Sequence, residues 1–167
     1  KKAILPPMGL LTIASLLPKD WPVRLVDLAV RPLRNRDIRW ADIVFLSAMF
    51  IQRKSADQII HRCQQEGKKV VVGGPLFTSV PEYYTHVDHL VLKEGEITLP
   101  KFLEDLRFGT PRKVYTTHEK ADLQYTPLPR WDLADKKKYG AMGIQYSRGC
   151  PFDCDFCDVT TLFGHRI

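Results

Sequence analysis

Short apolar runs that alternate with helical patterns constrain the fold of this chain more than any other feature. The runs are rich in Val, Ile and Leu and have the length of buried strands. Continuous apolar strands of this kind belong to a parallel sheet that helices cover on both faces, so the pattern predicts an α/β fold. Strands are expected at 23–27, 42–47, 69–74 and 88–92, and helices at 8–17, 37–40, 55–66 and 97–106.

Proline and glycine divide the chain into three parts. Residues 1–109 carry the alternating pattern, which we interpret as a doubly wound, Rossmann-like (flavodoxin-like) sheet. Because a helix precedes the first strand pattern, we expect the opening strand of this domain to lie outside the chain. Residues 110–141 are irregular and too long for an ordinary loop, so we interpret them as an interdomain linker. Residues 142–167 begin a second domain, with a strand expected at 142–147.

Three cysteines directly follow that last expected strand. Three residues separate Cys150 from Cys154, and two separate Cys154 from Cys157. Soft thiolates select iron–sulfur clusters or zinc, and three of them leave one position of a cubane cluster open for chemistry. A zinc site with His165 as fourth ligand is the alternative, although structural zinc ligands usually come in two close pairs. Cys63 lies alone in a helical pattern and is expected to be a buried apolar residue.

The stretch from Arg148 to Cys157 resembles the cluster loop of the radical S-adenosylmethionine (SAM) superfamily. The resemblance implies a [4Fe–4S] cluster held by Cys150, Cys154 and Cys157, with SAM chelated to the open iron. Reductive cleavage of SAM then gives a 5′-deoxyadenosyl radical. The aromatic residue before the third cysteine, Phe156, is expected near the adenine of SAM. The strand at 142–147 would open a (β/α) barrel of which this chain carries only the start.

Small, acidic or glycine residues follow each expected strand of the first domain. In an open parallel sheet, ligands bind at the carboxyl ends of the strands, and residues without bulky side chains let a large ligand approach the backbone. Each stretch taken alone has a structural explanation, such as a turn or a helix cap, but four of them at one edge favour a binding site. They are Asp27-Leu28, Ser47-Ala48, Gly73-Gly74-Pro75 and Glu94-Gly95-Glu96.

This arrangement resembles the cobalamin-binding domain that precedes the radical domain in B12-dependent radical SAM enzymes. Ser47 and Gly73-Gly74 match the serine and double glycine that line the nucleotide tail of cobalamin in that family. The Asp-x-His-x-x-Gly motif of corrinoid proteins that ligate cobalt through histidine is missing, because Ala29 stands where the histidine would fall. Within the family the chain looks closest to the group that contains hopanoid methylases.

The resemblance implies radical methyl transfer to an unactivated carbon, with cobalamin, SAM and the cluster as cofactors. The expected partners are a small-molecule or lipid substrate and an external electron donor of flavodoxin or ferredoxin type. A cobalamin-dependent cyclase or rearrangement enzyme is one alternative, and a cobalamin-binding module without catalysis in this fragment is another. An RNA methylthiotransferase would need further cysteines in its first domain, which Cys63 alone does not supply. No catalytic residue can be named from the sequence.

The positive charge of the chain does not indicate nucleic-acid binding. The net charge is +6, but the basic residues are spread along the sequence and lack a base-stacking aromatic pattern. The longest apolar stretch, 8–17, is too short to cross a bilayer. We therefore expect no transmembrane segment and no signal peptide, and a cytoplasmic location.

Overall fold

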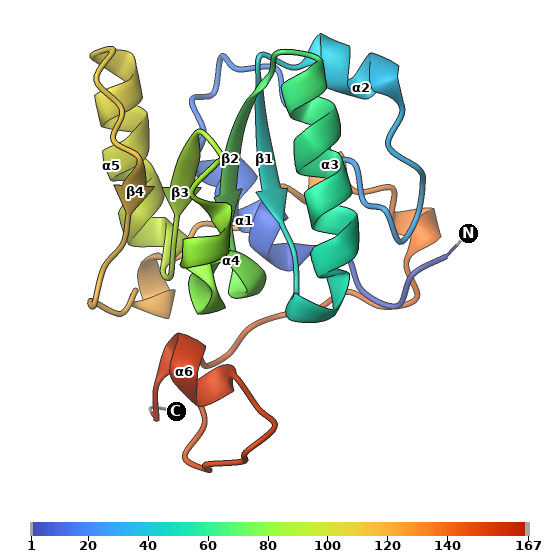
Figure 1. Cartoon of the computed structure of the whole chain (residues 1–167). Helices are drawn as coiled ribbons and strands as arrows, with labels where there is room; N and C mark the ends of the chain where they lie inside the picture. The colour runs from blue at the N-terminus through green and yellow to red at the C-terminus, as the bar shows by residue number, and fades with distance from the viewer. Residues whose placement is uncertain (1, 166–167) are drawn as a thin grey trace.

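A four-stranded parallel sheet forms the centre of the computed structural model, which describes residues 2–165 (Figure 1). The strand order is β1-β2-β3-β4, and each neighbouring pair is parallel. The predicted α/β, Rossmann-like class is confirmed, with three of the predicted strands in place. The strands are β1 (Ile43–Ser47), β2 (Lys69–Gly73), β3 (His89–Val91) and β4 (Val114–Tyr115).

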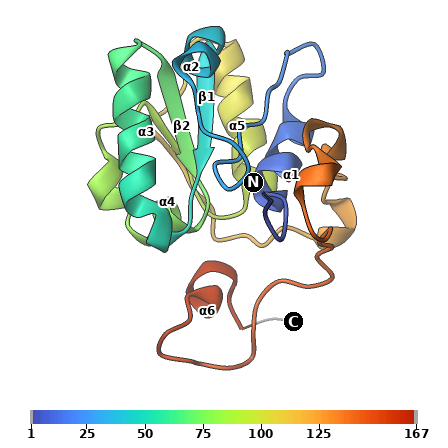
Figure 2. The same cartoon turned by 90° about the vertical axis from the view of Figure 1, so that its right-hand side faces the viewer.

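Helices cover both faces of the sheet, as the apolar strands require. Helix α3 (Arg53–Gln65) lies on one face, and α1 (Met8–Leu16) and α5 (Gly95–Arg107) lie together on the other (Figure 2). Helix α3 buries a stripe at the spacing of one helix face, formed by Ala56, Ile59, Ile60 and Cys63. Cys63 is fully buried, so its predicted role as a small apolar core residue is confirmed.

Aromatic packing fills the space between α5 and the sheet. Phe102 of α5 is fully buried and makes edge-to-face contacts with Phe45 of β1 and Tyr115 of β4. Helix α5 itself lies against β3 and β4, and the Phe102 ring extends its packing to β1. Strand β4 was not expected from the sequence, since it consists of two residues within the stretch interpreted as linker.

Three short α-helices and five 3-10 helices complete the regular structure of the described residues. Helix α2 (Asn35–Trp40) matches the helix expected at 37–40. Helix α4 (Pro75–Ser79) follows Gly74 directly and was not expected. Helix α6 (Val159–Phe163) lies after the last cysteine. No helix within residues 2–165 combines the length and apolar character needed to cross a membrane.

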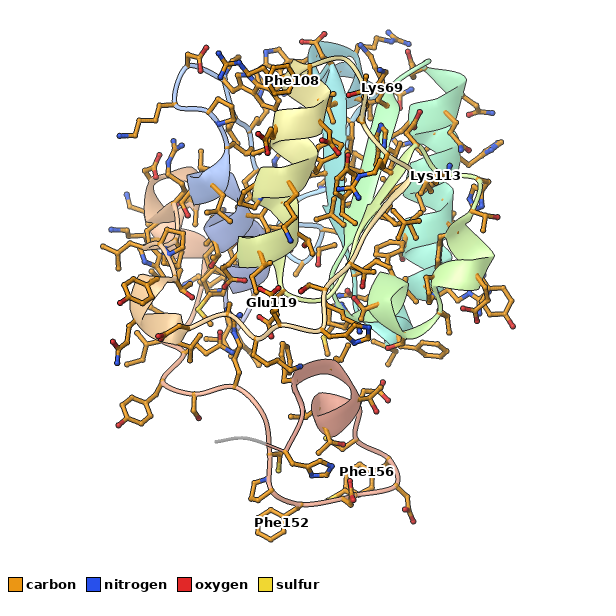
Figure 3. All side chains as sticks on the ribbon, turned by 90° about the vertical axis from the view of Figure 1, so that its left-hand side faces the viewer. Lys69, Phe108, Lys113, Glu119, Phe152 and Phe156 are labelled. Atoms are coloured by element: carbon orange, nitrogen blue, oxygen red, sulfur yellow. The ribbon has the colours of Figure 1, made fainter. Side chains whose placement is uncertain are left out.

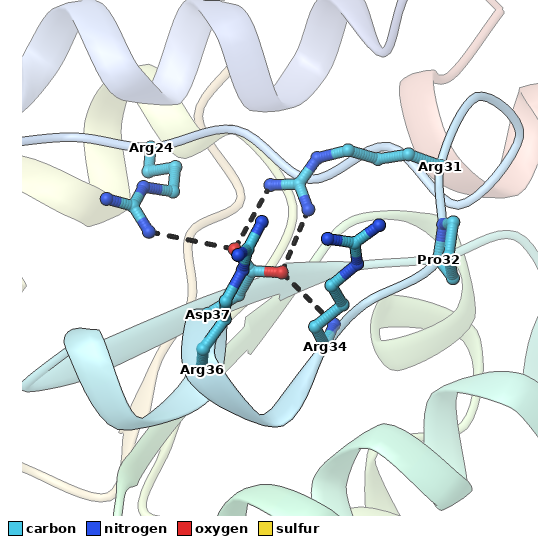
Figure 4. Close-up of a pocket in the computed structure, with 6 residues that line it drawn as sticks. All are labelled: Arg24, Arg31, Pro32, Arg34, Arg36 and Asp37. Atoms are coloured by element: carbon cyan, nitrogen blue, oxygen red, sulfur yellow. Dashed lines mark hydrogen bonds and ion pairs between the residues drawn. The ribbon is translucent and has the colours of Figure 1, made fainter.

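The strand predicted at 23–27 is wrong, because this segment is irregular and is tied to α2 by ion pairs instead (Figure 4). Asp37 is buried at the start of α2 and accepts a hydrogen bond from Arg31 Nη1 at 2.8 Å. Arg24 lies 3.6 Å from the same carboxylate and stacks on Trp40. The carbonyl of Leu25 accepts from Arg31, so the backbone of this segment is not paired with β1.

The strand predicted at 142–147 is also wrong, since no regular element occurs between residues 139 and 158. The stretch interpreted as linker contacts the preceding residues at several points, including two backbone contacts. Ala3 and Tyr139 form an isolated parallel bridge, and the Arg130 N–H donates to the carbonyl of Leu11 at 3.0 Å. The chain then continues as an extended loop beyond the carboxyl edge of the sheet (Figure 1), with no barrel strand in the described residues. Residues 166–167 of the predicted second domain lie outside the described part.

Candidate functional site

The sheet register brings Ser47 and the double glycine together at the carboxyl edge. Ser47 is paired with Gly73, the last residue of β2, and Gly74 follows with a φ of +86°. A side chain on Gly74 would place its Cβ 2.3 Å from Ser47 Oγ. Glycine is therefore required here by the backbone conformation and by the closeness of the serine. The structure confirms that these residues lie side by side.

Gly73 is closed in from the other neighbouring strand. It is paired with Val91 of β3, and a Cβ on Gly73 would come within 2.5 Å of the Val91 carbonyl oxygen. That oxygen belongs to the backbone of a buried strand and cannot move aside cheaply. The absence of side chains at both glycines leaves bare backbone at the carboxyl end of β2, which is the surface that a large ligand needs for close approach.

The loop after β1 adds apolar side chains at this edge. The carbonyl of Ala48 accepts the N–H of Leu76 at 2.9 Å, which joins the loop to α4 next to Pro75. Beyond Ala48 the chain exposes three large apolar residues, Met49, Phe50 and Ile51, with Ile51 92% exposed. An apolar patch next to bare backbone suits a large, partly apolar ligand. These residues lie between the strand expected at 42–47 and the helix expected at 55–66, and no pattern in the sequence predicted their exposure.

Asp27 and Leu28 follow no strand, because the strand predicted before them does not form. Asp27 Oδ1 accepts the Ala29 N–H at 2.8 Å, and Oδ2 accepts the Tyr139 hydroxyl at 3.0 Å. Burial and this contact with Asp27 raise the pKa of Tyr139 to about 12. Both carboxylate oxygens thus have partners in a turn that fastens the linker. A cobalamin contact by Asp27 or Leu28 stays a prediction.

A buried and a partly buried carboxylate after β3 meet a partly buried arginine from the cysteine region. Glu94, Gly95 and Glu96 lie between β3 and the first turn of α5. Arg148 Nη1 lies 2.5 Å from Glu94 Oε2, and Arg148 Nη2 donates to Glu96 Oε1. The side chains of Arg148 and Glu94 are only 15% and 3% exposed. Arg148 was seen in the sequence only as a neighbour of the cysteines, and its partners lie 52 and 54 residues away.

Charge pairing governs the titration of this cluster. Burial alone would raise the pKa of Glu96, but the hydrogen bond and charge of Arg148 outweigh it and hold that pKa below its ordinary value. Burial likewise opposes the charged form of Arg148, yet the two carboxylates raise the pKa of its guanidinium. Glu96 and Arg148 are therefore both expected to be ionised at neutral pH.

A small pocket lies between the sheet edge and α6. It has a volume of about 220 Å³, and Lys93, His118, Lys120 and Thr160 are among its lining residues. Lys93 follows β3 with a φ of +63°, which is uncommon for a residue with a side chain. The N–H of Lys93 donates to Thr78 Oγ1 at 3.1 Å, which holds this conformation. The pocket shows that the cysteine region packs against the carboxyl edge.

The three cysteines lie on the loop beyond this edge. The Cys150 N–H donates to the Gly164 carbonyl at 3.2 Å and closes the loop, and the Cys157 N–H donates to the Cys154 carbonyl at 2.9 Å. All three thiols are free and at least partly exposed. As a donor set they suit an iron–sulfur cluster with one open iron.

The cysteine side chains are not gathered into a ready set of ligands. Within residues 2–165, no group of three or more His, Cys, Asp or Glu side chains is placed to hold a metal ion. His165 Nε2 lies 3.7 Å from Asp153 Oδ1, so the alternative zinc site is not assembled either. Phe152 and Phe156 lie on the part of the loop away from the sheet (Figure 3), and Phe156 is 92% exposed. The cluster and the adenine contact of Phe156 remain predictions.

The parallel sheet, its bare glycine edge and its apolar loop define an α/β domain that binds a large ligand at the carboxyl ends of its strands. The family model described as "B12 binding domain" matches residues 2–103. The chain therefore belongs to the B12-binding domain family.

Most relatives that match nearly the whole chain are named methyltransferases or methylases, and one is named a cyclase. An uncharacterized methyltransferase of Synechocystis sp. is 44% identical over 168 residues, which is 99% of this chain and 31% of the relative. The hopanoid C-2 methylase of Rhodopseudomonas palustris is 40% identical over 168 residues, 98% of this chain and 32% of the relative. The anaerobic magnesium-protoporphyrin IX monomethyl ester cyclase of Synechocystis sp. is 27% identical over 194 residues, 93% and 38% of the two chains. The chain spans about a third of the length of the first two relatives.

Proposed function

We propose that this chain is the cobalamin-binding part, joined to the start of the radical domain, of a cobalamin-dependent radical SAM methyltransferase. The observation that carries the proposal is the convergence of two features on one edge of the sheet. The bare backbone at Ser47, Gly73 and Gly74 lies at the carboxyl ends of β1 and β2. The loop with Cys150, Cys154 and Cys157 lies beyond the same edge (Figure 1) and is joined to it by Arg148.

The chain's own residues have binding and positioning roles in this proposal. Ser47, Ala48, Gly73, Gly74 and Pro75 would receive the nucleotide tail of cobalamin, and the apolar loop after β1 would lie against the corrin ring. Cys150, Cys154 and Cys157 would hold a [4Fe–4S] cluster with one iron open to SAM. When bound, these cofactors supply the hydrogen-abstracting radical and the transferred methyl group. An external one-electron donor of flavodoxin or ferredoxin type would reduce the cluster.

The substrate class follows from the relatives alone and is part of the proposal. The hopanoid C-2 methylase relative acts, by its name, on a lipid. We infer a lipid or another small molecule with an unactivated carbon as the methyl acceptor. A cyclase is the second candidate, favoured by the relative named as a magnesium-protoporphyrin IX monomethyl ester cyclase. Product mass separates the two, because methylation adds one methyl group and cyclisation adds none.

Anaerobic absorption spectra with added hydroxocobalamin, before and after reconstitution with iron and sulfide, test both cofactors in one sample. We expect a cobalamin spectrum that stays with the protein through desalting, and a broad cluster absorption only after reconstitution. Cys154→Ala should remove the cluster absorption and leave cobalamin binding unchanged. Cys63→Ala is the matched control, because Cys63 is a free cysteine fully buried in α3.

A protein extended to the length of its relatives tests the reaction itself. Cys154→Ala should abolish reductive cleavage of SAM to 5′-deoxyadenosine, measured by chromatography, while Cys63→Ala should keep it. Cleavage by the Cys154→Ala variant at the unmodified rate would contradict the assignment of the cluster.

A further inference from the structure

The buried ion-pair cluster of Arg148, Glu94 and Glu96 joins two parts of the chain that are far apart in sequence. Each terminal nitrogen of the guanidinium faces a different carboxylate, and Arg148 Nε donates to Gln145 Oε1 at 3.0 Å. All three nitrogens of the planar fork are therefore in use. Contacts at all three nitrogens fix the orientation of the guanidinium group. The single ammonium group of a flexible lysine would not be fixed in this way.

Burial makes these contacts different from the other ion pairs of the molecule. The side chains of Arg148, Glu94 and Glu96 are 15%, 3% and 14% exposed. Buried charges must be paired, and a buried pair that loses one partner leaves the other charge uncompensated. Exposed pairs such as Arg130 with Asp132, where the side chains are 40% and 60% exposed, carry no such penalty. Removing one member of the cluster is therefore expected to cost more than breaking a surface pair.

The position of the cluster gives it consequences for the cysteine loop. Arg148 stands two residues before Cys150, and Glu94 and Glu96 flank the start of α5 at the carboxyl edge of the sheet. Beyond the loop, α6 is held by an exposed contact, the hydrogen bond from Lys120 Nζ to the Leu162 carbonyl at 3.3 Å. Glu96 also accepts from the hydroxyl of Thr126 in the linker at 3.3 Å. One rigid anchor thus fixes the entry to the loop, and the linker is attached to the same carboxylate.

We propose that Arg148 is a positioning residue that fixes the first cysteine of the loop against the carboxyl edge of the cobalamin-binding domain. It does so through Glu94 and Glu96, and it touches neither cofactor in this role. The proposal deepens the proposed function and rests on it for its chemical meaning, because the anchor sets where a cluster on the loop would stand relative to cobalamin. The anchor itself is a property of the chain and can be measured without cofactors.

Amide hydrogen exchange on this chain tests the anchor. Arg148→Gln should speed exchange of the hydrogen-bonded amides of the loop, those of Cys150 and Cys157, by about tenfold while β1 to β3 keep their protection, because a local opening loses its main restraint. Arg148→Lys keeps the positive charge but loses the planar guanidinium. Its loop should exchange at a rate between those of the unmodified chain and of Arg148→Gln. Arg130→Gln, the matched control at an exposed ion pair, should leave the loop unchanged. Unchanged exchange of the loop in Arg148→Gln would overturn the proposal.

A second variant covers the case in which the uncompensated glutamates prevent folding of Arg148→Gln. Changing Arg148, Glu94 and Glu96 together to Gln removes every charge of the cluster, leaves hydrogen-bonding groups at all three positions, and keeps the size of the two former glutamates. This triple variant should fold and show the same faster exchange of the loop. Protection of the loop equal to that of the unmodified chain would show that the ion pairs do not hold it.

A protein extended to the length of its relatives and loaded with cofactors allows a second measurement, the ratio of 5′-deoxyadenosine to methylated product. General destabilisation of the fold does not change this ratio. Arg148→Gln should retain the cluster and cobalamin spectra but form about tenfold more 5′-deoxyadenosine per methylated product, since a misplacement of the reacting groups by about 1 Å is costly. Arg148→Lys should recover part of the coupling. An unchanged ratio would overturn the positioning role. Failure of the proposed function would instead appear as missing cofactor spectra in the unmodified protein, while the exchange result would still stand.

Discussion

Gly73 is the residue whose replacement the sheet tolerates least. A Cβ there would meet the Val91 carbonyl oxygen at 2.5 Å, and that oxygen is backbone within a buried parallel pair. We predict that Gly73→Ala lowers the free energy of unfolding by about 1–3 kcal/mol, as overpacking does in well-packed cores. Gly9→Ala is the control, because Gly9 lies in α1 with nothing within 4 Å of an added Cβ. In urea unfolding, Gly9→Ala should have a free energy of unfolding equal to or slightly above that of the unmodified chain. An equal loss of stability in Gly9→Ala and Gly73→Ala would contradict the argument.

Gly74 differs from Gly73 because the group it would meet is movable. Its added Cβ would lie 2.3 Å from Ser47 Oγ, the end of a small side chain that can rotate. The positive φ remains a cost for any other residue. A side chain at either position would displace its neighbour, Val91 or Ser47, at the sheet edge proposed to receive cobalamin.

Asp37 gives the stability of the molecule a pH dependence at the acid end. The hydrogen bond from Arg31, together with the Arg34 N–H and the charge of Arg24, lowers the pKa of Asp37 from 3.8 to about 2 against the opposing effect of burial. A carboxyl group with a lowered folded-state pKa stabilises the fold above its unfolded pKa, and this contribution is lost as the pH falls through the folded value. The stabilisation is therefore complete above about pH 4 and lost toward pH 2.

Replacing this carboxylate measures its contribution. Asp37→Asn should cost about 1 kcal/mol at pH 7, a value kept small because Arg24 and Arg31 are partly exposed to solvent. The difference from the unmodified chain should shrink as the pH is lowered from 4 toward 2. Asp42→Asn, at an exposed aspartate, is the control and should change little. Urea unfolding at several pH values measures the free energy of unfolding of both proteins. A difference between them that grows as the pH falls would contradict the predicted direction of the pH dependence.

At the scale of elements, β4 depends on one tyrosine for its attachment to α5. The Tyr115 hydroxyl donates to Asp105 Oδ2 at 2.7 Å and accepts the Arg112 N–H at 2.7 Å, and its ring packs on Phe102. We predict that Tyr115→Phe costs about 1–2 kcal/mol, because the ring stays but two hydrogen bonds are lost. Tyr125→Phe is the control at a tyrosine that is 84% exposed. Thermal unfolding followed by circular dichroism should give a lower melting temperature for Tyr115→Phe and an unchanged one for Tyr125→Phe.

Elements with a strong periodic pattern could be predicted from the sequence, and elements fixed by distant contacts could not. Helix α3 and strand β2 follow directly from their apolar spacing. The segment 23–27 has the composition of a strand, yet Arg31 binds both the Leu25 carbonyl and Asp37 and draws the segment to α2. Strand β4 has only two residues, which is too short for any alternation to be visible.

At the scale of the whole molecule, the sequence predicted which residues meet at the sheet edge but not what connects that edge to the cysteine loop. Ser47 and Gly73 are brought together by parallel pairing, which follows from strand order alone. The contact of Arg148 with Glu94 and Glu96 depends on the path of an irregular linker, and no spacing rule encodes that path. The linker's own anchors, such as Tyr139 on Asp27 over a separation of 112 residues, are equally invisible in the sequence.

The same arrangement predicts that the two cofactor sites load independently. The proposed cobalamin contacts lie on β1, β2 and the loops after them, while the cysteines lie on a loop joined to this edge through Arg148 rather than through the thiols. Changing Cys150, Cys154 and Cys157 together to Ala should therefore leave cobalamin affinity unchanged. A ligand at about 100 times its dissociation constant stabilises the folded state by about 2.7 kcal/mol, so added hydroxocobalamin should raise the melting temperature of both proteins equally. Gly73→Ala should lose most of that rise. If the triple cysteine variant lost it instead, the cobalamin site would have to include the cysteine loop.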